Sequence, residues 1–214
     1  IILFFELVSI DCMSEEKASG FLSIYWLDLM IGRLAGSFAL SELRKGIKYA
    51  GIAGIPTVAC LVLGLLKGWD TAGIYSLFLL VGIGGFMLGK SSPPKALSIF
   101  GFFAFILIVI TISTTGYTAM WSLIGVGFFN SIMWGNIFSL AIEQLGKYKS
   151  QASSLLVMGI GGGAVFPFVQ GLIADHFNLH ISFALPLIGY AYIIFYGLYG
   201  HRVKPVTNKI QHNE

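Results

Sequence analysis

Charged residues are scarce in this chain of 214 residues. Only 11% of its residues are Asp, Glu, Lys or Arg, against about 25% in an ordinary soluble domain. Hydrophobic residues make up 56% of the chain. A soluble fold of this size has too little interior to bury so much apolar side chain. The composition therefore excludes an ordinary soluble protein and predicts an integral membrane protein.

Cysteine is also rare. Cys12 and Cys60 are too few and too far apart to predict a disulfide framework or a metal site, so no metal or other cofactor is expected. The net charge of +3 comes without a basic stripe that interleaves with aromatic residues, so nucleic acid is not an expected partner.

No catalytic set is recognisable. The four histidines lie near the ends of apolar runs or in the C-terminal tail, without a His-x-x-x-His pair on a buried helix and without a serine elbow. The sequence therefore predicts no catalytic residues and no enzyme. A membrane-embedded enzyme stays open as an alternative, and it would need His176 or His180 for activity.

Long uncharged runs are what the sequence has instead. A helix needs about 20 residues to cross the hydrocarbon core of a bilayer, and the runs 71–89 and 150–174 contain no charge. Turn-forming residues divide the apolar sequence. We expect an all-α, polytopic transmembrane helix bundle over residues 19–200, with seven spans at 19–41, 48–66, 72–89, 96–114, 117–142, 151–174 and 182–200.

The two ends of the chain are expected to lie outside this bundle. Residues 1–10 are apolar, without a basic region that would mark a signal peptide. They are interpreted as the cut end of another helix, which would make the chain a fragment whose preceding half is missing. Residues 1–18 would then be a truncated helix and an extracytoplasmic loop, and 201–214 a cytoplasmic tail.

Basic residues alternate between the predicted connections. Apart from Lys17, Lys67 and the intramembrane Arg33, every Lys and Arg falls in the connection after the first, third or fifth span or in the C-terminal tail. Short basic loops are retained in the cytoplasm. The pattern predicts a multi-pass protein of the cytoplasmic (inner) membrane with its C-terminus in the cytoplasm.

Two charged residues lie inside the first predicted span. Asp28 and Arg33 are five residues apart, so they are poorly placed for a pair within one helix. Charges in a membrane are costly and face the interior of a bundle. Asp28 is a candidate substrate or proton group and Arg33 a structural tether, unless both only satisfy each other or nearby carbonyls.

Asn130 and Trp134 share one face of the fifth span, and Asn136 points away from it. An amide bonds sugar hydroxyls, and an indole packs on the apolar face of a pyranose. Interhelical packing and an interfacial position are the alternative explanations.

Glycine is abundant, at 27 residues. The pairs Gly32/Gly36, Gly85/Gly89 and Gly159/Gly163 have the spacing that lets membrane helices approach closely. Glycines at 159–163 followed by a proline also predict a weakened or bent sixth span. Gln170 follows this bend and is a candidate cavity residue, although packing and a kink explain the pattern equally well.

Several stretches resemble one transporter group. Residues 23–26 and 30–37 resemble the eighth helix of the fucose/galactose/glucose:proton symporters of the major facilitator superfamily. Residues 127–143 and 145–175 are similar to the tenth helix, the following loop and the eleventh helix. The resemblance implies the C-terminal half of such a symporter, with 45–95 as an insertion of two extra helices.

The resemblance implies proton-coupled uptake of a monosaccharide, with lipid, protons and the missing N-terminal half as partners. It adds Tyr25 and Trp26 to Asn130, Trp134, Asp28 and Gln170 as candidate sugar contacts. Proton-coupling carboxylates would lie in the missing half.

Two departures from the group affect these expectations. Trp134-Gly135-Asn136 stands where the group commonly has Phe-Pro-Thr, so less bending is expected there, and Asp28 replaces a small residue. A self-associating half-size membrane protein with a structural or channel-like role is the alternative function.

Overall fold

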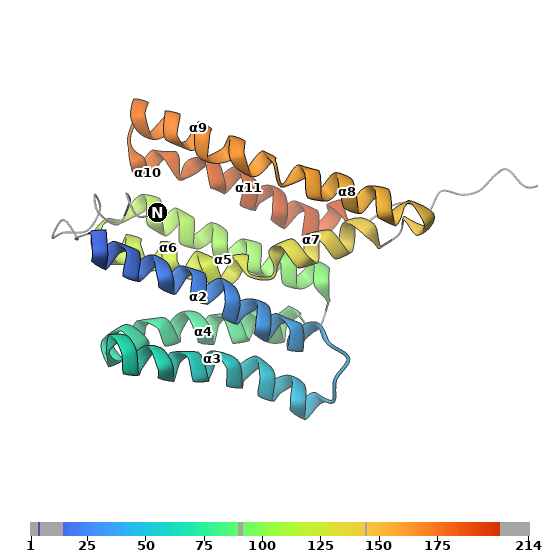
Figure 1. Cartoon of the computed structure of the whole chain (residues 1–214), viewed down its shortest axis with the longest axis horizontal. Coiled ribbons are helices and arrows are strands. Elements are labelled where there is room, and N and C mark those ends of the chain that lie inside the picture. Colours follow the sequence, from blue (N-terminus) through green and yellow to red (C-terminus); the bar gives the residue numbers. More distant parts are fainter. Residues whose placement is uncertain (1–3, 5–14, 90–91, 144, 202–214) are drawn as a thin grey trace, which may run out of the picture.

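The computed structural model describes Phe4 and residues 15–89, 92–143 and 145–201, and all regular elements in these ranges are helices (Figure 1). They are α2 (Glu15–Leu40), α3 (Lys45–Lys67), α4 (Trp69–Gly89), α5 (Pro93–Ser113), α6 (Gly116–Asn130), α7 (Met133–Ile142), η1 (Gly146–Tyr148), α8 (Lys149–Gly159), α9 (Gly162–His176), α10 (Leu179–Ser182), α11 (Ala184–Phe195) and the π-helical turn η2 (Tyr196–Gly200). Apart from Phe4, the predicted helix at 1–10 lies outside the described residues, as do most of the loop before α2 and the tail after residue 201.

Six helical stretches in the described part of the chain are long and apolar enough to cross a membrane. They are α3, α4, α5 and the compound stretches Gly116–Ile142, Gly146–His176 and Leu179–Gly200. Each matches a predicted span to within a few residues, so the all-α transmembrane bundle is confirmed. The first of the seven predicted spans corresponds to α2, which has 26 residues but is not among these six stretches.

The helices run up and down along one common direction (Figure 1). The α2–α3 and α7–α8 connections and the end of η2 lie at one end of the bundle, and the α3–α4 and α9–α10 connections lie at the other. The first of these ends is also where α3 begins at Lys45 and α8 begins at Lys149. The alternation that the basic residues predict is therefore present in the helix order.

The core of the bundle lies around α5 and α6, which pack along their length. Every residue of α6 from Ala119 to Phe129 is buried. Phenyl rings fill the centre: the ring centroids of Phe86 and Phe100 are 4.7 Å apart, and those of Phe103 and Phe129 are 5.3 Å apart. Helices α3 and α4, which include most of the predicted insertion, pack beside α2 at one edge of the bundle (Figure 1).

Glycines bring α2 and α6 into close contact. A Cβ atom added to Gly32 would collide with the Ser131 side chain, and one added to Gly36 would collide with Ile132. From the other side, a Cβ on Gly127 would lie 2.8 Å from the backbone oxygen of Tyr25. Small residues allow this approach because they leave room for the neighbouring backbone. Such packing holds membrane helices together, since lipid provides no hydrophobic force between them.

The other two glycine pairs differ in how closely they are packed. Cβ atoms on Gly85 and Gly89 would approach Phe100 and Ala96, so close packing at this pair is confirmed. Gly159 and Gly163 have open space around them, so the prediction of close packing at this pair is wrong.

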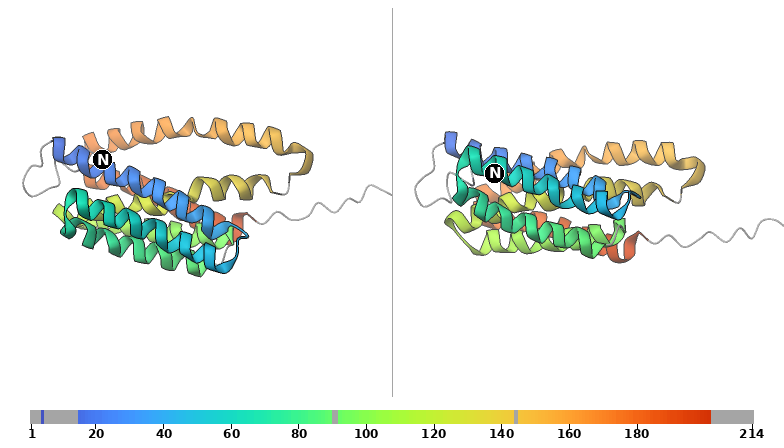
Figure 2. Two further views of the ribbon diagram at one scale, coloured as in Figure 1. Left: turned by 60° about the horizontal axis from the view of Figure 1, so that its bottom comes forward. Right: turned by 90° about the horizontal axis from the view of Figure 1, so that it is seen from below.

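Two predicted spans are interrupted. The sixth breaks between α8 and α9 at Ile160 and Gly161, as the glycine cluster predicts. The fifth breaks between α6 and α7 at Ser131 and Ile132, whereas Trp134-Gly135-Asn136 lies inside α7, so the expectation of less bending at these three residues stays a prediction. Helices α8 and α9 run along the outside of the bundle (Figure 2), and neither contains a buried residue.

Candidate functional site

The break between α6 and α7 lies beside two cavities, and Trp134 lines both. The α2/α7 cavity, of about 400 Å³, is lined by Arg33, Gly36, Ser37, Ser131, Ile132, Trp134, Gly135, Asn136 and Ser139. The α6/α11 cavity, of about 370 Å³, is lined by Asn130, Met133, Trp134, Ile137, Phe166, Pro186, Gly189, Tyr190 and Ile193. Both volumes lie in the range of small-molecule sites.

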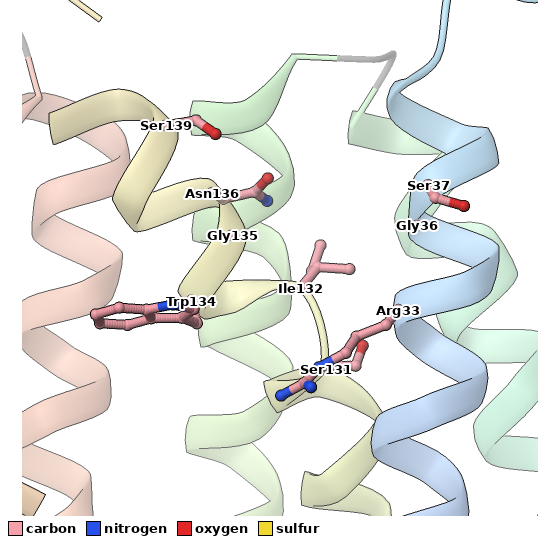
Figure 3. A pocket seen from close by; sticks show the side chains of 9 residues that line it. All are labelled: Arg33, Gly36, Ser37, Ser131, Ile132, Trp134, Gly135, Asn136 and Ser139. Carbon is pink, nitrogen blue, oxygen red and sulfur yellow. The ribbon is translucent and has the colours of Figure 1, made fainter. Parts of the chain in front are cut away.

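The α2/α7 cavity is rich in polar groups. Arg33 extends from α2 toward the helix break, and Asn136 points from α7 toward α2 (Figure 3). The Ser131 hydroxyl and the side-chain nitrogen of Asn136 are buried without a hydrogen-bond partner. Unpaired buried polar groups are costly.

The α6/α11 cavity contains the predicted pair of Asn130 and Trp134. Their common position confirms that they share a face, and Asn136 is not among the residues that line this cavity. The side-chain oxygen of Asn130 accepts a hydrogen bond of 2.9 Å from the Tyr190 hydroxyl. Tyr25 adjoins the same amide. Three of the predicted site residues are thus brought together.

Asp28 and Arg33 point to different places. Arg33 is exposed to the α2/α7 cavity, whereas Asp28 is 0% exposed. Neither carboxylate oxygen of Asp28 has a hydrogen-bond partner. Its polar neighbour is Tyr75 of α4, whose hydroxyl is also without a partner of hydrogen-bonding geometry. Asp28 therefore lies apart from the two cavities that meet at Trp134.

Trp26 and Gln170 are not brought to these cavities. Trp26 is 62% exposed on the outside of α2, where its ring meets the edge of Tyr25. Gln170 is half-buried on α9. Phe166, one helical turn earlier, lines the α6/α11 cavity, but Gln170 does not.

Sequence reasoning missed the polar residues that face the predicted ones. Tyr190 and Tyr75 each lie far along the chain from the residue they accompany, so spacing within one helix does not reveal them. A tyrosine in the middle of a span is a weak signal, because its hydroxyl needs a partner when it is buried. Ser131 gives no signal of its own, since a serine also packs between helices.

Within the described residues, no group of three or more His, Cys, Asp or Glu side chains is placed to hold a metal ion. The cavities offer amide, hydroxyl, guanidinium and indole groups. Such groups bind a neutral polar ligand by hydrogen bonds and ring packing.

Known proteins resemble part of this chain. A glucose/galactose transporter of Brucella abortus biovar 1 (strain 9-941) is 51% identical over 120 residues, which are 56% of this chain and 29% of that protein. The L-fucose-proton symporter of Escherichia coli K12 is 29% identical over 126 residues, 58% of this chain and 28% of that protein. The corresponding protein of Haemophilus influenzae is 32% identical over 107 residues, 47% of this chain and 25% of that protein.

The matched part thus spans less than a third of each of these relatives. No protein-family profile matches the chain, and no solved structure matches it. The interrupted helix, the polar cavities beside it and the relatives agree with the motifs in the sequence: this multi-pass membrane protein is similar to the fucose/galactose/glucose:proton symporters of the major facilitator superfamily.

Proposed function

We propose that this chain forms the sugar-binding half of a secondary transporter that takes up a monosaccharide together with protons. The observation that carries the proposal is the 51% identity over 120 residues to a protein named a glucose/galactose transporter. Glucose, galactose and L-fucose are the candidate substrates, because the relatives carry these names. No bond in the substrate is broken, and the chain acts without a catalytic residue.

The chemistry of the cavities supports a sugar as the ligand. The Trp134 indole offers an apolar surface for a pyranose ring, and it has polar groups on both sides. Asn130 and Asn136 supply donors and acceptors for hydroxyl groups. Tyr25 supports the site through its contact with the Asn130 amide. Trp26, Asp28 and Gln170 stay candidates only if the bundle rearranges during transport.

The helix break supports movement of the site. Transporters bind substrates near the midplane of the membrane at discontinuous helices, and they alternate access by rocking one repeat against another. Here the α6/α7 break carries Asn130 at one side and Trp134 at the other. The uncovered surface of α8 and α9, which contains no buried residue, leaves room for contact with an N-terminal half.

The orientation completes the proposal. We infer a multi-pass protein of the cytoplasmic membrane with the C-terminus and the basic connections in the cytoplasm. The end of the bundle where α3 and α8 begin would then face the cytoplasm. Arg33 would remain in the membrane as a structural charge at the α2/α7 cavity.

A direct test joins the chain to a complementary half. The N-terminal six helices of the Brucella relative would be co-expressed with this chain in bacteria that lack glucose and galactose uptake. We expect uptake of labelled galactose or glucose that a protonophore abolishes. Trp134→Ala should reduce this uptake at least tenfold, whereas Trp69→Ala, at the start of α4 and away from both cavities, should not.

Purification of the chain distinguishes the transporter from the alternative, a self-associating half-size membrane protein. A self-associating half-size protein would form a stable homo-oligomer in detergent and would need no second half. Mass measurement of the purified chain distinguishes the two cases. A stable dimer together with no uptake in the presence of the complementary half would favour the structural or channel-like role and contradict the transporter proposal.

A further inference from the structure

Asp28 and Tyr75 form a buried polar pair where α2, α4 and α6 meet. Both side chains are 0% exposed. Asp28 lies on the face of α2 that packs on α6, one turn before Gly32 and nearly one turn after Tyr25. Tyr75 reaches it from α4. This site is separate from the cavities at Trp134.

Within the described residues, no cation acts on the Asp28 carboxylate, and neither of its oxygens has a hydrogen-bond partner. The titratable groups around it are Tyr25 on its own helix, Tyr75 on α4 and Cys60 of α3 beside Tyr75. Helix α6 has no titratable residue from Ala119 to Phe129. An isolated carboxylate in such surroundings is strongly disfavoured, and the group takes up a proton instead. The neutral acid and the phenol can each donate to the other.

A small pocket lies one helical turn from this pair. The Lys67 pocket, of about 130 Å³, is lined by Gly20, Phe21, Ile24, Lys67 and Thr71. This volume is large enough for several water molecules, and Thr71 and Lys67 supply polar partners.

The Lys67 pocket and the pair of Asp28 and Tyr75 lie at successive turns of α2 and α4. Ile24 precedes Asp28 by one helical turn, and Thr71 precedes Tyr75 by one turn. Helices α2 and α4 run in the same direction (Figure 1). The buried pair therefore lies one turn deeper than the pocket on both helices.

We propose that Asp28 and Tyr75 form a proton-binding site in this bundle, filled through the Lys67 pocket. The Asp28 carboxyl holds the proton. On release, its O–H bond breaks, the proton passes to water in the pocket, and the carboxylate then accepts a hydrogen bond from Tyr75. The site needs neither sugar nor an N-terminal half, so it can be tested independently of the proposed function.

Infrared spectroscopy of the full chain in phosphatidylcholine vesicles tests the site. Near neutral pH we expect a carboxylic-acid band that shifts when aspartate is labelled with ¹³C and is lost in Asp28→Asn. Tyr75→Phe should move the band to higher frequency, because the acid loses its partner. The ¹³C shift needs no substitution, so misfolding of a variant cannot hide the result. Absence of a label-sensitive acid band, or a band that Tyr75→Phe leaves in place, would overturn the proposal.

Hydrogen exchange tests the route. In a chain without Cys12 and Cys60, Thr71→Cys would be modified with a bulky thiol reagent and transferred to heavy water. We expect the Asp28 band to exchange at least tenfold more slowly after modification. Ser76→Cys, at a half-buried position of α4 that does not line the Lys67 pocket, is the matched control and should leave the rate unchanged. Equal rates in the modified and unmodified Thr71→Cys proteins would exclude the Lys67 pocket as the entrance.

Discussion

The Tyr190 hydroxyl donates a hydrogen bond of 2.9 Å to the side-chain oxygen of Asn130. It joins the middle of α11 to the last residue of α6, directly before the helix is interrupted. The bond fixes the Asn130 carbonyl and leaves its amide hydrogens for Tyr25 or a ligand. Asn130 is therefore oriented before any substrate arrives.

Asn130→Ala should weaken sugar uptake far more than Asn136→Ala. Asn130 lies with Trp134 in the α6/α11 cavity, and its loss would also leave the hydroxyl of the half-buried Tyr190 without its partner. We expect at least a tenfold rise in the sugar concentration for half-maximal uptake, a change of about 1.4 kcal/mol. Initial uptake rates of the co-expressed halves provide the measurement. Equal effects of the two substitutions would contradict this assignment and favour the α2/α7 cavity.

Gly82→Ala should destabilise the bundle, whereas Gly84→Ala should not. A Cβ on Gly82 would collide with the ring of Phe128, but one on Gly84 meets nothing within 4 Å. Overpacking of this kind costs about 1–3 kcal/mol. Unfolding in mixed detergent micelles, followed by circular dichroism, measures the difference. Similar stability of both variants would show that Phe128 moves aside freely.

The Thr111 and Ser122 hydroxyls should stabilise the α5–α6 contact together. Their oxygens are 2.8 Å apart in the buried core, and each hydroxyl also contacts a carbonyl of its own helix. A double-mutant cycle with Thr111→Val and Ser122→Ala should give a coupling of about 0.6 kcal/mol, the average for hydrogen bonds within membranes. The same unfolding assay applies. A coupling of zero would mean that the backbone contacts alone satisfy both hydroxyls.

Reversing charge at Lys90 and Lys95 should disturb the orientation of the neighbouring spans. These residues contribute to the basic side of the predicted topology, and lysine in short loops holds that side in the cytoplasm. Cysteine labelling from outside intact cells reports the change in Lys90→Glu/Lys95→Glu. The control pair Lys17→Glu/Lys67→Glu should keep the original labelling. Unchanged labelling in the first pair would remove the basis for the orientation.

The sequence predicts the helices well because length and hydropathy determine them. The predicted span 96–114 becomes α5 at Pro93–Ser113, and the predicted span 48–66 becomes α3 at Lys45–Lys67. The break at Ile160 and Gly161 follows from glycines that favour it. The break at Ser131 and Ile132 has no such signal, because neither residue is a helix breaker.

The site is less predictable, since it depends on contacts between helices. Helical spacing is sufficient to place Asn130 and Trp134 on one face and to separate Asp28 from Arg33. It says nothing of Tyr190, which comes from another helix. The candidate roles of these residues, with those of Tyr25, Trp26 and Gln170, stay predictions until transport is measured.

The glycine contacts between α2 and α6 restrict how the candidate site can open. Gly32 and Gly36 place α2 directly against Ser131 and Ile132, the two residues at which the fifth span is interrupted. A sliding motion of α2 would force these surfaces into collision. The contact between α2 and the interrupted span is thus expected to stay fixed. Helix α7 would then rotate about Ser131 and carry Trp134 and Asn136 with it.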